Sequence, residues 1–385
     1  MRIGIDAHGL GGHSLGAGNE QYTRQLILNL LQIDRGNEYH LFVHEPDELR
    51  HLVADHPNAK LVALMPRNQW VQRPVSAPWY AWRHGLDVLH VPFIRPPFTH
   101  TRTVITVHDT LFETVPEYYT LLERTRMKAL VPWSCRRADL IFTVSEFSRR
   151  QIHQHYGVDP LRIVVTPNAA DHVDHQAANA ALHDADLPER YICFIGTLQP
   201  RKNLARLVRA FDELLARRAL PHHLLLVGRP GWNNGELMSA LASARHRRRI
   251  HLTGFVTESR MRSILLRSEL LVCPSIAEGF AVPPLEAQRA CIPVVVSRTT
   301  CFPEIYGDSA EYCDPLEESS IADAIETALC SPKRRLELME AGLRNSQRFS
   351  WRRMAEAALR AYRALALGDL AAPPEEVAMA KGVRR

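Results

Sequence analysis

The chain alternates short apolar runs with longer amphipathic stretches along almost its whole length, and this alternation restricts the folds open to it. In the first half, runs rich in Ile, Val and Phe lie at residues 2–7, 39–44, 87–91, 102–107 and 139–144. These runs are too apolar for a sheet with one face in water, so they predict strands buried on both faces. Helical candidates lie between them, such as residues 19–33 and the segment that follows Ser145, a suitable N-cap. The pattern predicts an α/β fold with a parallel, doubly wound sheet.

The alternation stops at a polar, alanine-rich stretch around residues 171–188 and then restarts. The second series of apolar runs lies at residues 191–196, 223–228, 249–254, 270–275, 293–297 and 310–314. A chain of 385 residues can bury two separate cores. We therefore expect two Rossmann-like domains in series. Their expected bounds are 1–172 for the N-terminal domain, 173–188 for a linker, 189–350 for the C-terminal domain, and 351–385 for a C-terminal helix that packs back toward the N-terminal domain, plus a tail.

The composition restricts the classes of protein to which this chain can belong. Hydrophobic residues make up 46% and charged residues 23%, as in ordinary soluble proteins. No run has the length of a membrane span, and the N-terminus lacks the apolar core of a signal peptide, so we expect a cytoplasmic protein. The net charge is only +5, and without interleaved aromatics we expect no nucleic-acid partner. Denser basic patches at 123–151 and 245–249 suit solvated helix faces, peripheral contact with the anionic inner face of a membrane, or contact with a phosphorylated acceptor.

In an open parallel sheet, ligands bind beyond the carboxyl ends of the strands, so the loops there hold the candidate site residues. The first such loop is rich in glycine, and Gly16 and Gly18 lie where it meets a helix. Glycines let backbone amides approach a phosphate. A dinucleotide fingerprint with Glu45 as its ribose acid is the weaker interpretation, because Ser14 stands where the third glycine belongs. A flexible turn is the structural alternative.

Two pairs of polar residues follow other predicted strands. His108 and Asp109 follow the run at 102–107, where such a pair can contact sugar hydroxyls or manage protons, or simply cap a turn. Arg201 and Lys202 precede a helix in the second half, so their charges and the helix dipole can converge on one diphosphate. A surface ion pair is the alternative for these two cations.

The stretch "EGFAVPPLE" places two carboxylates around a helix start. Glu278 falls in the loop after a predicted strand, and Glu286 falls about one turn into the next helix. The backbone amides of Phe280, Ala281 and Val282 lie between them, at a helix N-terminus suited to anions. We therefore expect Glu278 to accept from sugar hydroxyls, the amides to hold phosphate, and Glu286 to accept from ribose hydroxyls.

These motifs resemble those of a known enzyme family. "EGFAVPPLE" resembles the E-x7-E motif of retaining GT-B glycosyltransferases of the family 4 (group 1) type, and "FIGTLQPRKNL" resembles their phosphate-binding loop. "TVSEFSRRQI", "LLLVGRPGW" and "LTGF" resemble further segments in the same order. The resemblance implies two Rossmann-like domains that face each other across a cleft. It also implies transfer of a sugar from a nucleotide diphosphate sugar with retention of anomeric configuration, and neither a metal ion nor a cofactor.

The resemblance also implies roles for individual residues. It makes His108, Glu278, Arg201 and Lys202 the catalytic set. It implies a donor-binding set of Gly16, Gly18, Gly196, Arg201, Lys202, Val256, Glu278, Phe280, Ala281, Val282 and Glu286, and it places Asp109 on the acceptor side. The segment "GTLQPRKN" is similar to members that use GDP-mannose, so mannose is the expected sugar. A glycan or polyprenyl-diphosphate-linked acceptor in polysaccharide biosynthesis is the expected partner.

The sequence departs from the family pattern at three positions. Ala281, Cys291 and Ala169 stand where the family usually has glycine, and Ala169 puts the geometry of its turn in doubt. Residues 184–186 form a D-x-D, a metal motif of another glycosyltransferase fold, which we interpret as solvated linker. Two other functions fit the same fold: a nucleotide-sugar epimerase, and a nucleotide-sugar-binding protein without catalysis.

Overall fold

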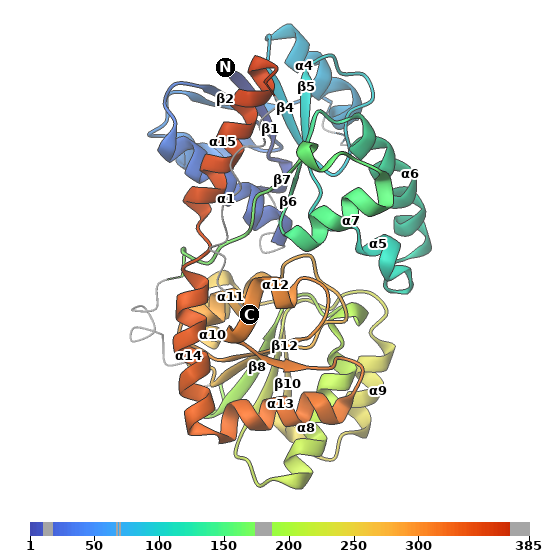
Figure 1. The fold of residues 1–385 in the computed structure, drawn as a ribbon, viewed down its shortest axis with the longest axis vertical. Helices are drawn as coiled ribbons and strands as arrows, with labels where there is room; N and C mark the ends of the chain where they lie inside the picture. The colour runs from blue at the N-terminus through green and yellow to red at the C-terminus, as the bar shows by residue number, and fades with distance from the viewer. Residues whose placement is uncertain (11–17, 67, 69–70, 174–186, 370–385) are drawn as a thin grey trace. The chain divides into compact units, whose positions relative to one another are not determined.

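The computed structural model describes residues 1–10, 18–66, 68, 71–173 and 187–369, and these residues group into two compact units. The N-terminal unit comprises Met1–Asn168 and Ser350–Arg385, and the C-terminal unit comprises Ala169–Phe349 (Figure 1). Residues 169–172, which we expected in the N-terminal domain, therefore group with the C-terminal unit. Most of the expected linker lies outside the described residues.

Within the described residues, the N-terminal unit contains a seven-stranded parallel sheet in the order β3-β2-β1-β4-β5-β6-β7. The strands are β1 (Arg2–Asp6), β2 (Glu38–Val43), β3 (Ala59–Ala63), β4 (Val88–Pro92), β5 (Arg102–Thr106), β6 (Leu140–Thr143) and β7 (Ile163–Val165). The five predicted strands are confirmed. The two edge strands, β3 and β7, were not predicted, because β3 is only partly buried and β7 has three residues.

Helices connect these strands, and their ends follow from local sequence. They are α1 (Gly18–Ile33), α2 (Pro46–Val53), α4 (Ala77–Arg83) after the π-helical turn η2 (Gln72–Ser76), α5 (Leu111–Thr114), α6 (Leu121–Arg137) and α7 (Glu146–Tyr156). The predicted N-cap at Ser145 is confirmed: its Oγ accepts a hydrogen bond from the Ser148 N–H at 3.1 Å. Gly157 ends α7 in the left-handed conformation, with φ of 66°.

The helix α15 (Trp351–Leu367) returns to the N-terminal unit, where it packs against α1 and β4 (Figure 1). Its Tyr362 hydroxyl lies 2.6 Å from Nδ1 of His90 on β4. The other ring nitrogen of His90 lies 2.7 Å from Oγ1 of Thr106. Burial lowers the pKa of His90 to about 3, so its imidazole is neutral at neutral pH and joins α15 to the sheet.

In the described part of the C-terminal unit, a six-stranded parallel sheet has the order β10-β9-β8-β11-β12-β13. The strands are β8 (Tyr191–Ile195), β9 (His223–Val227), β10 (Ile250–Gly254), β11 (Leu270–Cys273), β12 (Val294–Ser297) and β13 (Glu311–Cys313). The helices are α8 (Leu204–Arg217), α9 (Gly235–Ser243), α10 (Glu258–Arg267), α11 (Val282–Arg289), α12 (Phe302–Tyr306), α13 (Glu318–Cys330) and α14 (Pro332–Ser346). All six predicted strands are confirmed, and so is the two-domain α/β fold.

The loops after β8 and β9 meet backbone to backbone. Gly196 and Gly228 both have φ of 147°, and a Cβ on Gly228 would lie 2.0 Å from the Gly196 carbonyl oxygen. Only glycine permits this approach. This close contact between the two loops constrains the backbone that leads from β8 to Arg201 and Lys202.

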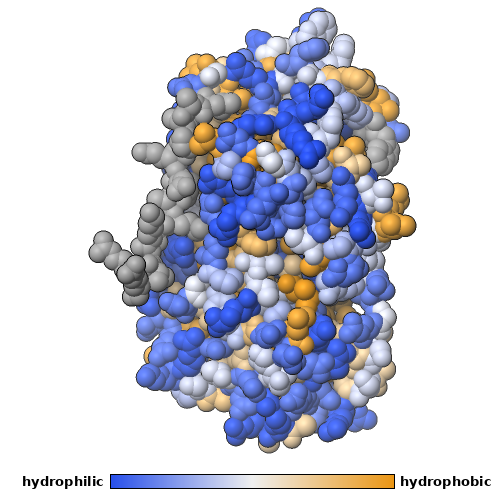
Figure 2. Space-filling model, turned by 45° about the vertical axis from the view of Figure 1, so that its right-hand side comes forward, coloured by the Kyte–Doolittle hydropathy of each residue, from blue (hydrophilic) through white to orange (hydrophobic). Residues whose placement is uncertain are grey.

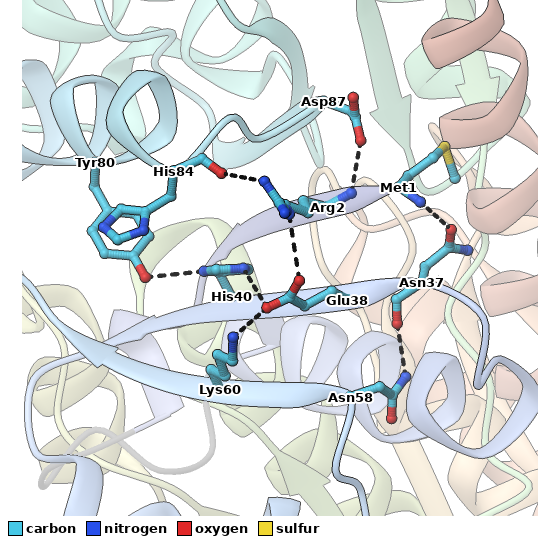
Figure 3. Close-up of polar contacts among 10 residues, drawn as sticks. All are labelled: Met1, Arg2, Asn37, Glu38, His40, Asn58, Lys60, Tyr80, His84 and Asp87. Carbon is cyan, nitrogen blue, oxygen red and sulfur yellow. Dashed lines mark hydrogen bonds and ion pairs between the residues drawn. The ribbon is translucent and has the colours of Figure 1, made fainter.

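A polar network fixes the amino ends of the first strands in the N-terminal unit (Figure 3). The Met1 ammonium donates to Oδ1 of Asn37 at 2.9 Å, and the Arg2 N–H donates to Oδ2 of Asp87 at 2.7 Å. The Glu38 carboxylate lies 3.5 Å from Nε of Arg2. This network lies at the amino ends of the strands, opposite to the carboxyl ends where ligands are expected, so we assign it a structural role.

Candidate active site

The centre of the candidate site is a buried carboxylate between two cations in the C-terminal unit. Glu278 lies in the loop after β11 and is only 5% exposed. Its Oε2 accepts a hydrogen bond from Nη1 of Arg201 at 2.7 Å, and its Oε1 contacts Nζ of Lys202. The structure therefore brings three of the four predicted catalytic residues into one cluster.

Electrostatics keep this cluster charged. Burial alone would raise the pKa of Glu278, but the positive charges of Arg201 and Lys202 and their hydrogen bonds hold it at about 2. The carboxylate is therefore ionised at neutral pH. Two cations and one carboxylate leave a net charge of +1, which suits an anionic ligand such as a diphosphate.

A buried asparagine, which was not predicted, positions the loop that carries the two cations. Asn203 has φ of 63° and is the N-cap of α8. Its Nδ2 donates to the carbonyl oxygens of Pro274 at 3.0 Å and Pro315 at 2.6 Å. It thereby ties together the loops that follow β8, β11 and β13. The one signal in the sequence is the residue type, since asparagine tolerates the left-handed region better than most residues.

Thr300 supports the backbone of Glu278, and it also was not predicted. Its Oγ1 accepts a hydrogen bond from the Glu278 N–H at 3.2 Å. Its φ is 52°, which is an unfavourable conformation for a β-branched residue. Strained residues of this kind persist where the surrounding structure holds them, often at functional sites. The adjacent Thr299 donates through Oγ1 to the carbonyl oxygen of Ile276 at 3.1 Å.

The predicted helix start between the two glutamates is confirmed. Ala281 is the N-cap, α11 begins at Val282, and Pro283 lies in its first turn. α11 starts with Val282, and Pro283 and Pro284 carry no N–H, so the backbone amides that can serve an anion at this helix N-terminus are those of Phe280, Ala281 and Val282. Ala281 has φ of 66°, which explains why a glycine would also suit this position.

Glu286 lies on α11, and a histidine contacts it. Nε2 of His172 lies 3.1 Å from Oε1 of Glu286, and both side chains are largely buried. No pattern around His172 indicated this contact, because the two residues are 114 positions apart. His172 is therefore a further residue at the candidate donor site.

In the N-terminal unit, His108 lies two residues after the end of β5. Its side chain is 8% exposed, and burial lowers its pKa to about 4, so the imidazole is neutral at neutral pH. The ring lies edge-on to Tyr22, with 5.0 Å between centroids. Oδ1 of Asp109 accepts the Leu111 N–H at 3.1 Å, which is the turn-capping role left open by the sequence.

The remaining predicted residues fall in different places. Gly196 directly follows β8, Gly18 begins α1, and Val256 follows β10 with its side chain partly exposed. Gly16 and the D-x-D at 184–186 lie outside the described residues. Ala169 is fully buried and has no positive φ, so the doubt about its turn does not hold.

Metal-ligating side chains do not cluster in the part of the chain that the structure describes. No group of three or more His, Cys, Asp or Glu residues there could hold a metal ion. No helix among the described residues is both long and apolar enough to cross a bilayer.

Two protein-family models together match most of the chain. A model described as "Glycosyltransferase Family 4" matches residues 17–173, and one described as "Glycosyl transferases group 1" matches residues 177–345. The chain belongs to the family 4, group 1 glycosyltransferases. The second match contains the whole Arg201, Lys202 and Glu278 cluster and also Glu286.

Individual relatives are also glycosyltransferases. O-antigen chain mannosyltransferase B from Escherichia coli is 30% identical over 283 residues, which cover 72% of this chain and 74% of that protein. Serotype-specific mannosyltransferase WbdA from Escherichia coli is 27% identical over 59% of this chain, and the match spans 29% of that longer protein. Among solved structures, Anabaena Alr3699/HepE in complex with UDP and glucose superposes with a TM-score of 0.72 at 17% identity, covering 94% of this chain and all of that one. This last likeness concerns the fold alone.

Proposed function

We propose that this glycosyltransferase transfers mannose from GDP-mannose to a glycan acceptor, with retention of anomeric configuration and without a metal ion. The observation that carries the proposal is the Glu278 carboxylate held between Arg201 and Lys202, beside a helix N-terminus. The net positive charge of this cluster suits a diphosphate leaving group. The similarity to O-antigen chain mannosyltransferase B supports mannose as the sugar and a polysaccharide as the product.

The reaction breaks the bond between the anomeric carbon and the diphosphate oxygen. Arg201, Lys202 and the backbone amides of residues 280–282 stabilise the negative charge that develops on the diphosphate. The acceptor hydroxyl forms its bond to the anomeric carbon on the face from which the diphosphate leaves, and its proton passes to a diphosphate oxygen. A buried, ionised Glu278 accepts hydrogen bonds from donor-sugar hydroxyls, and neutral His108 also contacts the sugar.

The nucleoside is held further along the C-terminal unit. Glu286 accepts hydrogen bonds from the ribose hydroxyls, and the backbone near Val256 contacts the base. Gly196 lets the loop after β8 approach the diphosphate. The buried position of Glu286 on α11 supports this arrangement, since a largely desolvated carboxylate binds hydroxyls strongly.

We propose that the N-terminal unit binds the acceptor and contacts the inner face of the membrane, where polyprenyl-diphosphate-linked glycans would be present. Val75, Trp79 and Trp82 form an exposed stripe at helical spacing on η2 and α4, with 52%, 60% and 68% exposure. On α6, Leu121 and Leu122 are about 80% exposed. Figure 2 shows separate hydrophobic areas on an otherwise mainly hydrophilic surface. Tryptophan and leucine near arginine-rich helices are typical of interfacial contact.

The decisive experiment is a calorimetric titration without added metal, using GDP-mannose, UDP-glucose, dTDP-rhamnose and NAD. We expect GDP-mannose to bind and the Glu286→Ala variant to lose this binding. Binding of another nucleotide sugar would overturn the choice of donor, and binding of NAD alone would overturn the glycosyltransferase site.

Product analysis separates the catalytic alternatives. Transfer with a retained α-linkage, unaffected by EDTA, is the expected result. Conversion of the nucleotide sugar without any acceptor would indicate an epimerase, and binding without turnover would indicate a non-catalytic binding protein. An inverted linkage, or activity lost to EDTA and restored by magnesium, would contradict the proposed mechanism.

A further inference from the structure

A buried carboxylate and histidine form a pair at the carboxyl end of β1 that the proposed mechanism does not use. Asp6 is the last residue of β1, and His8 follows in a 3-10 turn; they are 7% and 6% exposed. Nδ1 of His8 lies 2.6 Å from Oδ1 of Asp6, which also accepts the His8 backbone N–H at 3.1 Å. The Asp6 carboxylate therefore fixes the orientation of the His8 imidazole, with Nδ1 toward the carboxylate and Nε2 away from it.

Two further polar residues extend this pair to the surface. Nε of Arg73, on η2, lies 3.3 Å from Oδ2 of Asp6, and the Arg73 side chain is 41% exposed. The ring of His44, directly after β2, lies 4.5 Å from that of His8 and is partly exposed. Burial alone would raise the pKa of Asp6, but His8 and Arg73 lower it below the ordinary value. The cluster is thus an ionised carboxylate with one permanent cation and two imidazoles.

The remaining nitrogen of His8 is left without a partner. Nε2 is buried and makes no hydrogen bond to any residue that the structure describes. Unpartnered buried polar atoms are rare, because each costs about 1–3 kcal/mol of desolvation. A purely structural Asp-His pair accounts for Nδ1 but not for Nε2, so Nε2 is available to a ligand.

The chemistry of Nε2 selects the class of ligand. With Nδ1 on the carboxylate, Nε2 accepts a hydrogen bond when the imidazole is neutral and donates one when it is protonated. A hydroxyl group suits both states, whereas an anion suits only the second and would approach the charge of Asp6. A compound rich in hydroxyl groups is therefore the better match.

The position of the cluster in the sheet agrees with a ligand site. It lies at the carboxyl ends of β1 and β2, where open parallel sheets bind ligands, and the structural network of Figure 3 lies at the opposite edge. We propose that His8, oriented by Asp6 and flanked by His44 and Arg73, binds a hydroxyl group of the sugar acceptor. This inference rests on the proposed function, because it assigns the acceptor subsite of that reaction.

Histidine ring NMR tests the subsite without enzymatic turnover. In the full chain with ¹⁵N-labelled histidine rings, the resonances absent from His8→Gln identify His8. Titration with methyl α-D-mannopyranoside should shift the His8 Nε2 resonance saturably. No shift would overturn the proposal. A shift with inorganic phosphate in place of the mannoside would make the cluster an anion site and would also overturn it.

Steady-state kinetics test the same residue in the reaction, with methyl α-D-mannopyranoside as the acceptor. His8→Gln should raise the acceptor KM about tenfold, the effect of one lost hydrogen bond of about 1.4 kcal/mol, and leave GDP-mannose affinity unchanged. Asp6→Asn should act in the same direction, because it removes the group that orients the ring. His84→Gln, at the opposite sheet edge, is the matched control and should change neither constant.

The two measurements separate this inference from the proposed function. If the wild-type protein fails to bind GDP-mannose while the mannoside still shifts His8, the donor assignment fails and the subsite stands. If His8→Gln loses GDP-mannose binding, or leaves the acceptor KM unchanged, the subsite assignment is wrong.

Discussion

Nε2 of His172 lies 3.1 Å from Oε1 of Glu286, the carboxylate proposed to hold the donor ribose. A carboxylate has two oxygens and several lone pairs, so this contact engages one oxygen and leaves the other for a ligand. A fixed carboxylate binds its ligand at a smaller entropic cost than a mobile one. We therefore expect His172 to position Glu286 for donor binding, although it lies outside the α11 motif.

Replacing His172 tests this positioning role. We expect His172→Ala to weaken GDP-mannose binding about three- to tenfold, the effect of one hydrogen bond of about 1 kcal/mol. His172→Gln can still donate a hydrogen bond to Glu286, so it should keep most of the affinity. Isothermal titration calorimetry measures both variants. Tighter binding by His172→Ala would mean that His172 competes with the donor for Glu286.

Removal of Lys202 should affect both catalysis and stability. In Lys202→Ala, the buried carboxylate of Glu278 keeps Arg201 as a partner but loses one cation, so its pKa should rise and the free energy of unfolding should fall by about 1–3 kcal/mol. Turnover should fall about 100-fold or more, since charge on the leaving diphosphate loses a stabilising group. Activity assays and urea unfolding measure the two effects.

Arg218→Ala is the matched control for this charge deletion. Arg218 also pairs with a glutamate, since its Nη2 lies 2.7 Å from Oε1 of Glu326, but its side chain is 63% exposed. Exposed pairs contribute little, so the unfolding free energy should change by less than about 0.5 kcal/mol and activity should not change. Equal losses in the two variants would contradict the special environment of Glu278.

Sequence patterns predicted the fold well because buried parallel strands are continuous apolar runs. All eleven predicted strands exist, within a residue or two at their ends. β3 escaped prediction because it is only partly buried and lacks a continuous apolar run, and β7 because it is short; position at a sheet edge is not the reason, since the edge strands β10 and β13 were predicted. The N-cap at Ser145 was also predictable, since capping depends on residues within one turn.

The site was only partly predictable. Arg201, Lys202, Glu278 and Glu286 stand in local motifs, and the first three do form one cluster. The supporting residues act across long separations: 22 positions between Thr300 and Glu278, and 114 between His172 and Glu286. Neither residue type nor spacing predicts such contacts, because the contacts form only when segments that are distant in the sequence meet at the carboxyl ends of the strands.

Two residues in the left-handed region give a stability prediction. Ala281 and Cys291 have φ of 66° and 58°, a conformation that costs a non-glycine residue about 1–2 kcal/mol. Glycine removes this cost but adds about 0.5–1 kcal/mol of unfolded-state entropy. Ala281→Gly and Cys291→Gly should therefore each stabilise the protein by up to about 1 kcal/mol in urea unfolding. Ala290→Gly, at φ of −88°, should destabilise it.

Stability should fall in mild acid because His90 resists protonation in the folded state. Its pKa is about 3 when folded against an ordinary value of 6.5, so between these values only the unfolded chain binds the proton. The free energy of unfolding therefore decreases as pH falls from 6.5, by about 2 kcal/mol at pH 5 from this residue. His108, with a pKa of about 4, acts in the same direction.

Urea unfolding at pH 7 and pH 5 isolates the contribution of His90. The ordinary pKa of glutamate, 4.5, lies below this window, and that of Glu278 is lower still, so this carboxylate does not titrate within it. His90→Gln should be less stable at pH 7, because contacts to Tyr362 and Thr106 change. It should also lose about 2 kcal/mol less between the two pH values. An unchanged difference would contradict the proposed titration.

Thr300 should show opposite effects on stability and activity. Thr300→Gly removes a β-branched side chain from φ of 52°, which should raise the free energy of unfolding by up to about 1 kcal/mol. It also removes the oxygen that accepts the Glu278 N–H, so the loop that carries Glu278 becomes less ordered. A small displacement of a catalytic group can reduce turnover about 100-fold. We therefore expect a more stable and less active enzyme.

Thr300→Ser separates the two effects, because serine keeps the accepting oxygen and lacks the second branch at Cβ. It should retain wild-type turnover and gain part of the stability. Thermal unfolding and initial-rate assays on the three proteins are sufficient. Full activity of Thr300→Gly would mean that the hydrogen bond to Glu278 does not position the carboxylate. A Thr300→Gly variant less stable than the wild type would mean that the strain at Thr300 costs less free energy than its hydrogen bond to Glu278 contributes.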